Sequence, residues 1–285
     1  MRCLIDGDIA AYEGAFAGQY VDEETEEVCM RPADWVMERL DQQIKNIEEA
    51  CGADEPSLLF FTGDEKLLKH VNRRRKRDGE EPLQFTPNFR FEVAVSTPYK
   101  ERKSTKPLHF DNVRAYLLGA YECRVFFGME ADDGMCIEQT SAGDSDTVIC
   151  TRDKDLRQCP GWHYGWECGN QPEFGPKLVE GVGYIERTKQ GIKGWGPKFF
   201  YSQLITGDVV DSIPGLPGAG PAAAVKALAD CETERQCYEA VRDLYRKRMG
   251  EDWLTYLQEQ ANLLYMIREL DEEGKPVFYR PPKED

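Results

Sequence analysis

Acidic side chains are the residues of this sequence best suited to chemistry. They gather in three short segments, EADD (residues 130–133), DKD (153–155) and DVVD (208–211), and two single aspartates follow apolar runs. An acid at the start of a helix is often only a favourable partner of the helix dipole. Nine carboxylates in five segments, however, repel one another unless cations neutralise them, and oxygen ligands suit Mg²⁺ or Mn²⁺. The candidate metal ligands are Asp6, Asp64, Glu130, Asp132, Asp133, Asp153, Asp155, Asp208 and Asp211.

Other catalytic residue types are scarce. The three histidines lie far apart, which leaves little material for a His-rich metal site or a Ser-His-Asp triad. The ten cysteines include no C-x-x-C pair, and several fall in or beside apolar runs, so we expect buried, reduced thiols. The chain has neither a leader-like N-terminus nor about 18 consecutive apolar residues, which predicts a cytoplasmic protein that does not span a membrane.

The elements that must position the acids follow from hydrophobic patterns. Residues 2–6, 57–62 and 147–151 are short apolar runs typical of buried parallel strands. Helical patterns lie between them, at residues 36–47, 112–121 and 132–139. This alternation predicts a doubly wound α/β fold with a mostly parallel sheet, in which ligands bind beyond the carboxyl ends of the strands.

Two domains are expected. Residues 1–195 would form the α/β core, and residues 196–285 a helical subdomain with long helices at 232–249 and 252–270. A Gly/Pro-rich turn, IPGLPGAGP, precedes those two helices at residues 213–221.

Charge is unevenly distributed along the chain. The net charge is −16, which by itself argues against binding nucleic acid. Residues 66–106, however, hold twelve Lys or Arg against five Asp or Glu. One basic segment is therefore set in an acidic protein.

Read in order, six motifs resemble the 5′-nuclease family: LIDGD (4–8), TGD (62–64), YKERK (99–103), EADD (130–133), TRDKD (151–155) and GDVVDSIPGLPGAG (207–220). That family includes flap endonucleases, the 5′-exonuclease domain of bacterial polymerase I and the exonucleases of T-odd coliphages. The stretches VICTRDKDLRQCPGW and GWECGN are most similar to the phage enzymes. The resemblance covers about residues 2 to 270 and implies a PIN-like core with a helix-three-turn-helix at 207–229.

The resemblance also implies roles for single residues. The nine acids would bind two divalent ions directly or through water. Lys100 matches the arch lysine that polarises the scissile phosphate, and Arg102 or Lys103 would stand for its second basic partner. Asp8 is expected to be the N-cap of the following helix, with a ligand role as the alternative.

DNA contacts are expected at two places. The helix-three-turn-helix would grip duplex DNA through backbone amides and K⁺, although Ser212 and Ala222 depart from the family pattern. The insertion at 65–86 carries a basic run that is either a solvated loop or a guide for a single-stranded 5′ end. The candidate DNA contacts are Arg73, Arg74, Arg75, Lys76, Arg77, Arg90, Tyr99, Gly215, Gly218, Gly220 and Lys226.

The sequence therefore predicts a monomeric 5′-to-3′ exonuclease or 5′-flap endonuclease that hydrolyses DNA by two-metal chemistry, with RNA–DNA hybrids as a further candidate substrate. Two alternatives remain open at this point. One is a single-strand ribonuclease of the PIN type, against which the helical subdomain argues. The other is a DNA-binding module without activity, against which the nine retained acids argue.

Overall fold

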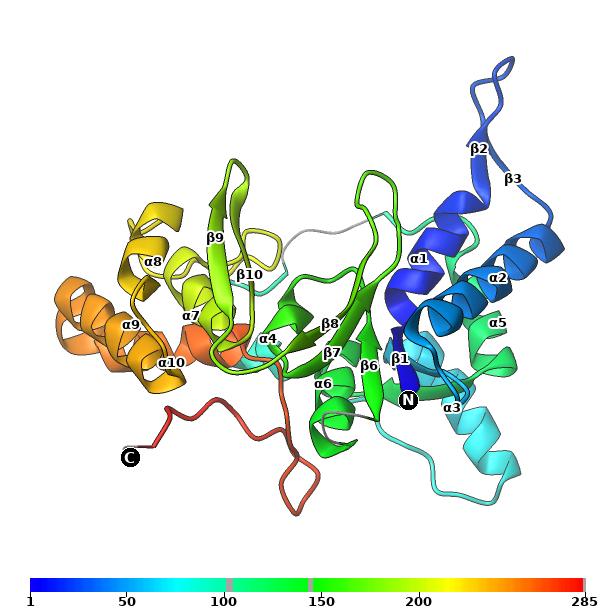
Figure 1. Cartoon of the computed structure of the whole chain (residues 1–285). Helices are drawn as coiled ribbons and strands as arrows, with labels where there is room; N and C mark the ends of the chain where they lie inside the picture. The colour runs from blue at the N-terminus through cyan, green and yellow to red at the C-terminus, as the bar shows by residue number, and fades with distance from the viewer. Residues whose placement is uncertain (101–104, 143–145, 284–285) are drawn as a thin grey trace.

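The computed structural model describes residues 1–100, 105–142 and 146–283, and its centre is a six-stranded sheet (Figure 1). The strand order is β5-β4-β1-β6-β7-β8. All neighbouring pairs are parallel except the last, between β7 and β8. The doubly wound, mostly parallel α/β fold is confirmed. The strands are β1 (Arg2–Asp6), β4 (Leu58–Thr62), β5 (Glu122–Phe126), β6 (Thr147–Cys150), β7 (Gly161–Gly165) and β8 (Phe174–Val179).

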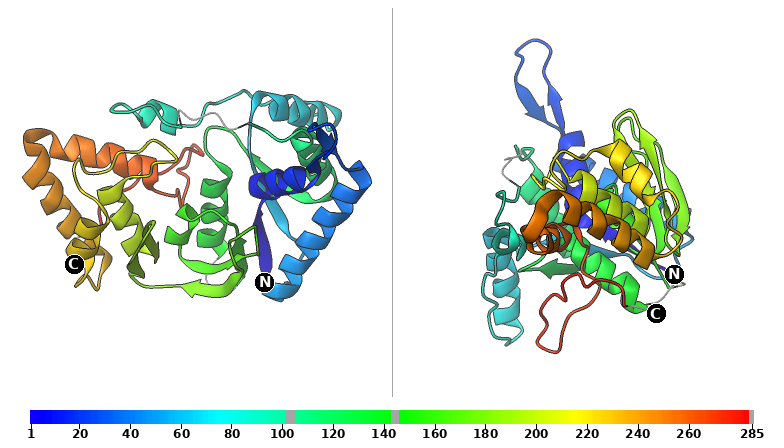
Figure 2. Two further views of the ribbon diagram at one scale, coloured as in Figure 1. Left: turned by 90° about the horizontal axis from the view of Figure 1, so that it is seen from above. Right: turned by 90° about the vertical axis from the view of Figure 1, so that its left-hand side faces the viewer.

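Helices cover both faces of this sheet, which is why its central strands are buried along almost their whole length. On one face lie α1 (Gly7–Ala17), α2 (Ala33–Cys51) and α5 (Phe110–Ala120), and on the other lies α6 (Ala131–Ala142) (Figure 2). The helical pattern at 36–47 is confirmed, since Val36, Leu40, Ile44 and Ile47 are all buried.

The basic insertion is partly helical and not a loop throughout. Residues Glu65–Arg77 form α3, which begins where the Asp64 side chain accepts a hydrogen bond from the Leu67 amide. The cationic run occupies the last turn of α3, where the helix dipole favours positive charge. A short helix, α4 (Arg90–Val93), follows the insertion.

The C-terminal region is helical, as expected, and has its own core. It contains α7 (Pro197–Thr206), α8 (Pro221–Leu228), α9 (Glu234–Met249) and α10 (Trp253–Leu264). The last helix is shorter than the pattern at 252–270 predicted. It ends at Leu264 because the following segment is extended and bonds to residues of the α/β core.

Two hairpins were not predicted. The β2–β3 hairpin (Gln19–Val21 and Val28–Met30) projects from the body, and the β9–β10 hairpin (Tyr184–Thr188 and Gly191–Trp195) stands beside α7 (Figure 1). Two short 3-10 helices, η1 (Asp155–Gln158) and η2 (Gly250–Asp252), complete the structure. Within the described ranges, no helix has the length and apolar character needed to cross a membrane.

Candidate metal centre

The acids follow strands whose carboxyl ends share one edge of the sheet. Asp6 ends β1, Asp64 follows β4, and Asp153 follows β6. The EADD segment comes after β5 and opens α6. A cavity of about 1140 Å³ lies at this edge. Six of the nine predicted ligands line it: Glu130, Asp132, Asp153, Asp155, Asp208 and Asp211.

Asp6, Asp132 and Asp153 form a group of acids whose charges interact. Thr151 organises two of them: its hydroxyl donates to Asp6 (Oγ1 to Oδ2, 2.8 Å) and accepts from the Asp153 amide (3.0 Å). Burial raises the pKa of Asp6 and of Asp153 to about 7. Burial, together with the charges of Asp6 and Asp153, raises the pKa of Asp132 well above its usual value.

These three acids lack a lysine or arginine ion-pair partner within the described part of the chain. Among the described residues, none of them forms an ion pair within 4.0 Å. The charges of these carboxylates disfavour one another, which adds to the effect of burial on the pKa of Asp132, and hard divalent ions are the partners that such oxygen donors prefer. The donor set therefore fits Mg²⁺ or Mn²⁺.

Two lysines each bridge two of the remaining acids of the cavity, here called the outer acids: Glu130, Asp155, Asp208 and Asp211. The Lys154 ammonium contacts Asp208 and lies 3.4 Å from Asp155. The Lys100 ammonium lies 2.6 Å from Glu130 and 3.8 Å from Asp211. Burial alone would lower the pKa of Lys100, but the two acids outweigh it and raise this pKa. The outer acids thus attract positive charge at two places.

The DVVD segment forms a turn. Asp208 and Ile213 pair as an isolated bridge, and the Asp208 carboxylate accepts from the Val210 amide at 2.8 Å. The turn is compact because Gly207 and Gly215 meet: a Cβ on Gly215, whose φ is 65°, would lie 2.3 Å from the Gly207 nitrogen. This turn places Asp208 and Asp211 in the cavity wall.

Asp64 lies apart from the six acids of the cavity. Its Oδ2 accepts from Arg114 at 2.9 Å, and Lys106 lies 3.6 Å away. Burial raises the pKa of Asp64, but the Leu67 amide and Arg114 outweigh burial, so that this pKa is lowered. Arg114 is a residue that sequence reasoning missed. Its signal was an arginine on the otherwise apolar, buried face of α5.

The expected cap at Asp8 is wrong. Helix α1 follows β1 directly, so Asp6 is the N-cap and accepts from the Ile9 amide at 3.0 Å. Asp8 lies within the first turn and accepts instead from the Thr62 amide at 2.8 Å. Its carboxylate therefore ties α1 to the end of β4.

Several predicted DNA contacts lie elsewhere than expected. Arg90 is 1% exposed and is paired with Asp133 in the interior, so it is not available to a phosphate. Tyr99 is 5% exposed, and its hydroxyl donates to Asp211 at 3.1 Å and faces Glu130, so it too is withdrawn from solvent. Both assignments are corrected. Arg102 and Lys103 fall outside the described residues.

The other candidate contacts are accessible, except Gly215, which is buried. Arg73, Arg74, Lys76 and Arg77 are exposed on α3, and Arg75 is half-buried. Lys226 is exposed on α8, and Gly218 and Gly220 lie in the turn before this helix. Gly215 serves the packing against Gly207 described above.

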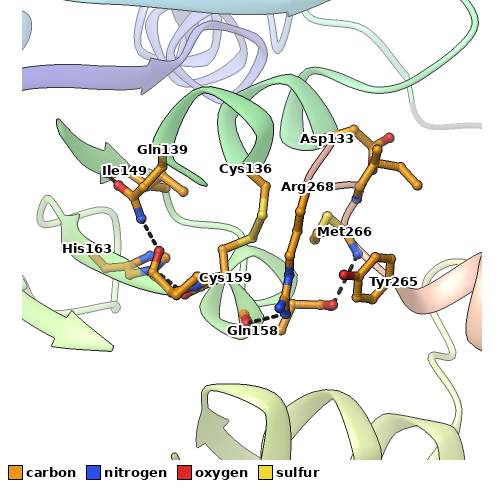
Figure 3. The surroundings of a disulfide bond; sticks show 12 residues. Asp133, Cys136, Gln139, Ile149, Gln158, Cys159, His163, Tyr265, Met266 and Arg268 are labelled. Atoms are coloured by element: carbon orange, nitrogen blue, oxygen red, sulfur yellow. Dashed lines mark hydrogen bonds between the residues drawn. A yellow bond between two sulfur atoms is a disulfide. The ribbon is translucent and has the colours of Figure 1, made fainter. Parts of the chain in front are cut away.

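One prediction about the cysteines is wrong. Cys136 on α6 and Cys159 just after η1 form a disulfide, with 6.0 Å between their Cα atoms (Figure 3). The other eight cysteines are free, as expected. Among the described residues, one group of three His, Cys, Asp or Glu side chains has its potential ligand atoms all within 4.8 Å of one another. This group consists of the buried thiols of Cys3, Cys51 and Cys150. These thiols lie in the core and not in the acidic cavity.

Comparisons with known proteins agree with the sequence motifs. The chain is 31% identical over 145 residues to DNA polymerase I of Rhizobium leguminosarum and 32% identical over 155 residues to DNA polymerase I of Pseudomonas aeruginosa. The matches cover 46% and 50% of this chain but only 13% and 15% of those longer proteins. The resemblance to 5′ nucleases is thereby confirmed. No family model matches the sequence.

Solved structures are similar only loosely. The T5 D15 protein co-crystallized with metal ions has a TM-score of 0.46 at 12% identity, covering 92% of this chain and 93% of that one. The catalytic core of Rad2 in complex with DNA has a TM-score of 0.41 at 14% identity, covering 95% and 76%. Because both TM-scores lie below 0.5, nothing about function follows from these likenesses.

Proposed function

We propose that this chain is a metal-dependent 5′ nuclease that hydrolyses phosphodiester bonds in DNA, as a 5′-to-3′ exonuclease or 5′-flap endonuclease. The observation that carries the proposal is the cavity at the carboxyl edge of the sheet, where acids from β6, α6 and the DVVD turn meet Lys100. Asp6 lies beside this group, linked to Asp153 through Thr151. Such a set can bind cations and a phosphate together, which is what this hydrolysis needs.

Two divalent ions are assigned to the acids. When bound, Mg²⁺ or Mn²⁺ would activate the attacking water and stabilise the departing oxygen. The chain itself orients the carboxylates: Thr151 and the Ile9 amide fix Asp6, and Gln203 lies in hydrogen-bond contact with Asp155. Held in this way, the carboxylates lose little freedom when cations arrive, which favours binding.

Lys100 is assigned to the scissile phosphate. Its ammonium pairs with Glu130 in the cavity wall. The Lys100 side chain is 40% exposed there, so it can turn toward an incoming anion. A fixed cation at that place stabilises negative charge as it develops on the phosphate oxygens. No histidine base is required, which agrees with the scarcity of histidines.

The surfaces around the cavity are proposed to bind DNA. Exposed cations on α3 and Lys226 on α8 would contact backbone phosphates, and the glycine-rich turn before α8 would carry duplex DNA, with K⁺ as a further ion. The exposed turn and helices of the C-terminal unit favour a duplex-containing substrate over the single-stranded RNA of a PIN-type ribonuclease. An RNA–DNA hybrid is a further candidate substrate, and the monomer is the proposed active form.

The test compares three labelled substrates: a duplex with a recessed 5′ end, a 5′-flap duplex and single-stranded RNA. We expect cleavage of the DNA substrates with Mg²⁺ and none with EDTA. Asp132→Asn should lower turnover by several orders of magnitude, because it removes a charged ligand deep in the cluster. Thermal melting serves as the folding control. Cleavage of RNA alone would favour the ribonuclease, and near-wild-type turnover of a folded Asp132→Asn protein would exclude this metal site.

A further inference from the structure

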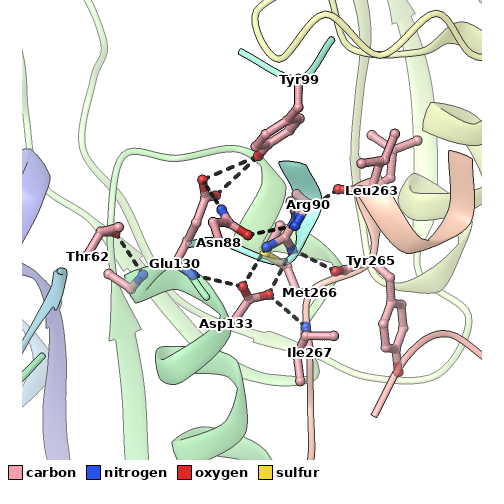
Figure 4. A network of polar contacts seen from close by, with 12 residues as sticks. Thr62, Asn88, Arg90, Tyr99, Glu130, Asp133, Leu263, Tyr265, Met266 and Ile267 are labelled. Atoms are coloured by element: carbon pink, nitrogen blue, oxygen red, sulfur yellow. Dashed lines mark hydrogen bonds and ion pairs between the residues drawn. The ribbon is translucent and has the colours of Figure 1, made fainter. Parts of the chain in front are cut away.

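Asp133 is the sequence neighbour of the proposed metal ligand Asp132 but does not itself line the cavity. It is fully buried in the first turn of α6 and pairs with Arg90, which is also buried. The guanidinium holds both carboxylate oxygens, with Nη1 2.6 Å from Oδ2 and Nη2 2.8 Å from Oδ1 (Figure 4). This is a two-pronged arginine–carboxylate pair, the geometry in which such pairs are strongest.

The remaining acceptor positions of Asp133 are also occupied. Oδ2 accepts from the Glu130 amide at 3.1 Å, and Oδ1 accepts from the Ile267 amide at 3.0 Å. A carboxylate offers about four acceptor positions. All of them are filled by the protein, so Asp133 has none left for a cation. Its neighbour Asp132 differs, because it lines the cavity and forms no ion pair among the described residues.

Arg90 extends the contact to the C-terminal unit. Its Nε donates to the Leu263 carbonyl and its Nη2 to the Tyr265 carbonyl, both at 3.0 Å. Carbonyls in the last turn of a helix lack partners within it, and α10 ends at Leu264. The ion pair thus joins three segments that are distant in sequence: α4, the start of α6 and the chain after α10.

The same network holds both the main-chain amide and the side-chain carboxylate of Glu130. Asp133 holds the Glu130 main-chain amide. Asn88 accepts from the Arg90 amide at 3.0 Å and donates from Nδ2 to the Glu130 carboxylate at 3.0 Å. Figure 4 shows these contacts converging on Glu130, beneath Tyr99.

We propose that Asp133 is a positioning residue and not a metal ligand: with Arg90 it locks the start of α6 to the segment at 263–267 and so holds Glu130 and Asp132 where the cations bind. This inference rests on the proposed metal-dependent function. It removes one of the nine carboxylates from the ligand set. It also gives the chain after α10 a part in assembling the site.

A positioning role and a metal-ligand role for Asp133 predict different Mn²⁺ affinities for a variant in which both Arg90 and Asp133 are replaced. Removing one member of a buried ion pair leaves the other unpaired, whereas replacing both with apolar residues of similar volume is often tolerated. We therefore compare Asp133→Asn, the double variant Arg90→Met with Asp133→Leu, and Asp132→Asn as the ligand control. Mn²⁺ affinity is measured by electron paramagnetic resonance, and folding by thermal melting.

We expect Asp133→Asn to lower Tm by roughly 10 °C and to weaken Mn²⁺ binding about 10-fold or more. The double variant should regain part of the lost Mn²⁺ affinity, because it leaves neither charge unpaired in the interior, while Asp132→Asn weakens Mn²⁺ binding without the loss of Tm. A folded double variant that loses Mn²⁺ as Asp132→Asn does would overturn the proposal.

A second measurement needs no variant and decides the matter if the double variant does not fold. Amide hydrogen exchange is followed in wild-type protein with and without Mg²⁺. If Asp133 is a positioning residue, the Glu130 and Ile267 amides stay protected when Mg²⁺ binds. If Asp133 turns to bind the ion, both amides lose their acceptor and exchange faster. Failure of the proposed function looks different, because the wild-type protein would then bind no Mn²⁺ at all.

Discussion

At the scale of single residues, two acids that are adjacent in the sequence have different surroundings. Asp132 faces the cavity and Asp133 faces Arg90, although they are adjacent in the sequence. Successive helical residues point about 100° apart, so two adjacent acids at a helix start cannot share one environment. The sequence could therefore predict an acidic site but not which acids of the EADD segment line it.

Lys100 is the residue whose role is most open to a kinetic test. We expect Lys100→Ala to lower single-turnover cleavage roughly 100- to 1000-fold, as loss of one group that stabilises developing charge does. DNA affinity, measured by gel shift in Ca²⁺, should change much less, because the interaction strengthens only in the transition state. Lys45→Ala, an exposed lysine of α2, is the matched control. Equal losses in turnover and affinity would make Lys100 a binding residue only.

Partners distant in sequence account for most of what residue patterns missed. Arg114 on α5 reaches Asp64, and Gln203 on α7 reaches Asp155. Neither residue belongs to a motif, since each contact depends on how elements distant in the sequence pack together. By contrast, Glu130 and Asp153 were proposed from acidic motifs, and Lys100 from the resemblance of YKERK to the 5′-nuclease family.

At the scale of elements, strands and helices with strong apolar periods were predicted well. Strands β1, β4 and β6 and helices α2 and α9 lie where the patterns indicated. Strands β5, β7 and β8 carry mixed residues and were not predicted. Strands β5 and β8 are the two edges of the sheet and are only partly covered, whereas β7 is largely buried. Helix α3 was missed because its apolar residues, Leu67, Leu68 and Val71, span little more than one turn before the charged run begins.

Strand β7 contains a histidine that should make stability depend on pH. Burial, helped by Arg157, lowers the pKa of His163 to about 4, even though the ring nitrogen Nε2 lies 2.9 Å from the Cys159 carbonyl. The unfolded chain has a histidine pKa of about 6.5. Between these values the unfolded state binds a proton that the folded state excludes. This contribution therefore lowers stability as pH falls from about 6.5 to 4, by roughly 3 kcal/mol in all.

The test is urea unfolding of wild type and His163→Gln at pH 7.5 and pH 5. Glutamine can still donate to the Cys159 carbonyl but does not titrate. We expect the loss of unfolding free energy between the two pH values to be smaller in the variant. Equal losses in the two proteins would show that His163 does not carry this pH dependence.

The disulfide links two elements that carry acids. Cys136 lies on α6 with Asp132, and Cys159 follows η1, which begins at Asp155. Closing a loop of this size, with a sequence separation of 23, stabilises a fold by about 3 kcal/mol in the chain-entropy account. We expect a reductant to lower the Tm of wild type but not that of Cys136→Ser. A wild-type Tm that does not respond to reductant would show that the bond contributes nothing to stability.

At the scale of the whole molecule, charge separation is the dominant feature. A protein of net charge −16 repels DNA at long range, so binding depends on local cationic surfaces. Helix α3 supplies one such surface, at the end of the segment that follows Asp64. The sequence identified this run by composition, but only the fold shows that its cations are arranged on a helix.

The cations of α3 are expected to contribute to binding and not to chemistry. Arg75 is engaged by Glu80 at 2.8 Å and by the Glu81 carbonyl at 2.7 Å, whereas Arg73, Arg74, Lys76 and Arg77 form no ion pair within the described part of the chain. Each phosphate contact on a single strand contributes roughly 0.7 to the slope of log affinity against log salt. Replacing the four free cations with Gln should flatten that slope by about 1.4 if two of them contact phosphate at once, with saturating turnover unchanged.

Substrates with a single-stranded 5′ end should show a larger change than blunt duplex, because α3 follows directly from Asp64 at the carboxyl edge of the sheet. A control protein with Gln at Arg39, Lys45, Lys275 and Lys283 carries the same change in net charge at other exposed places, and it should keep the wild-type slope. Equal flattening in both proteins would assign the effect to net charge. An unchanged slope in the α3 variant would mean that this helix is only a solvated surface, and a collapse of saturating turnover would mean that it helps to shape the active site.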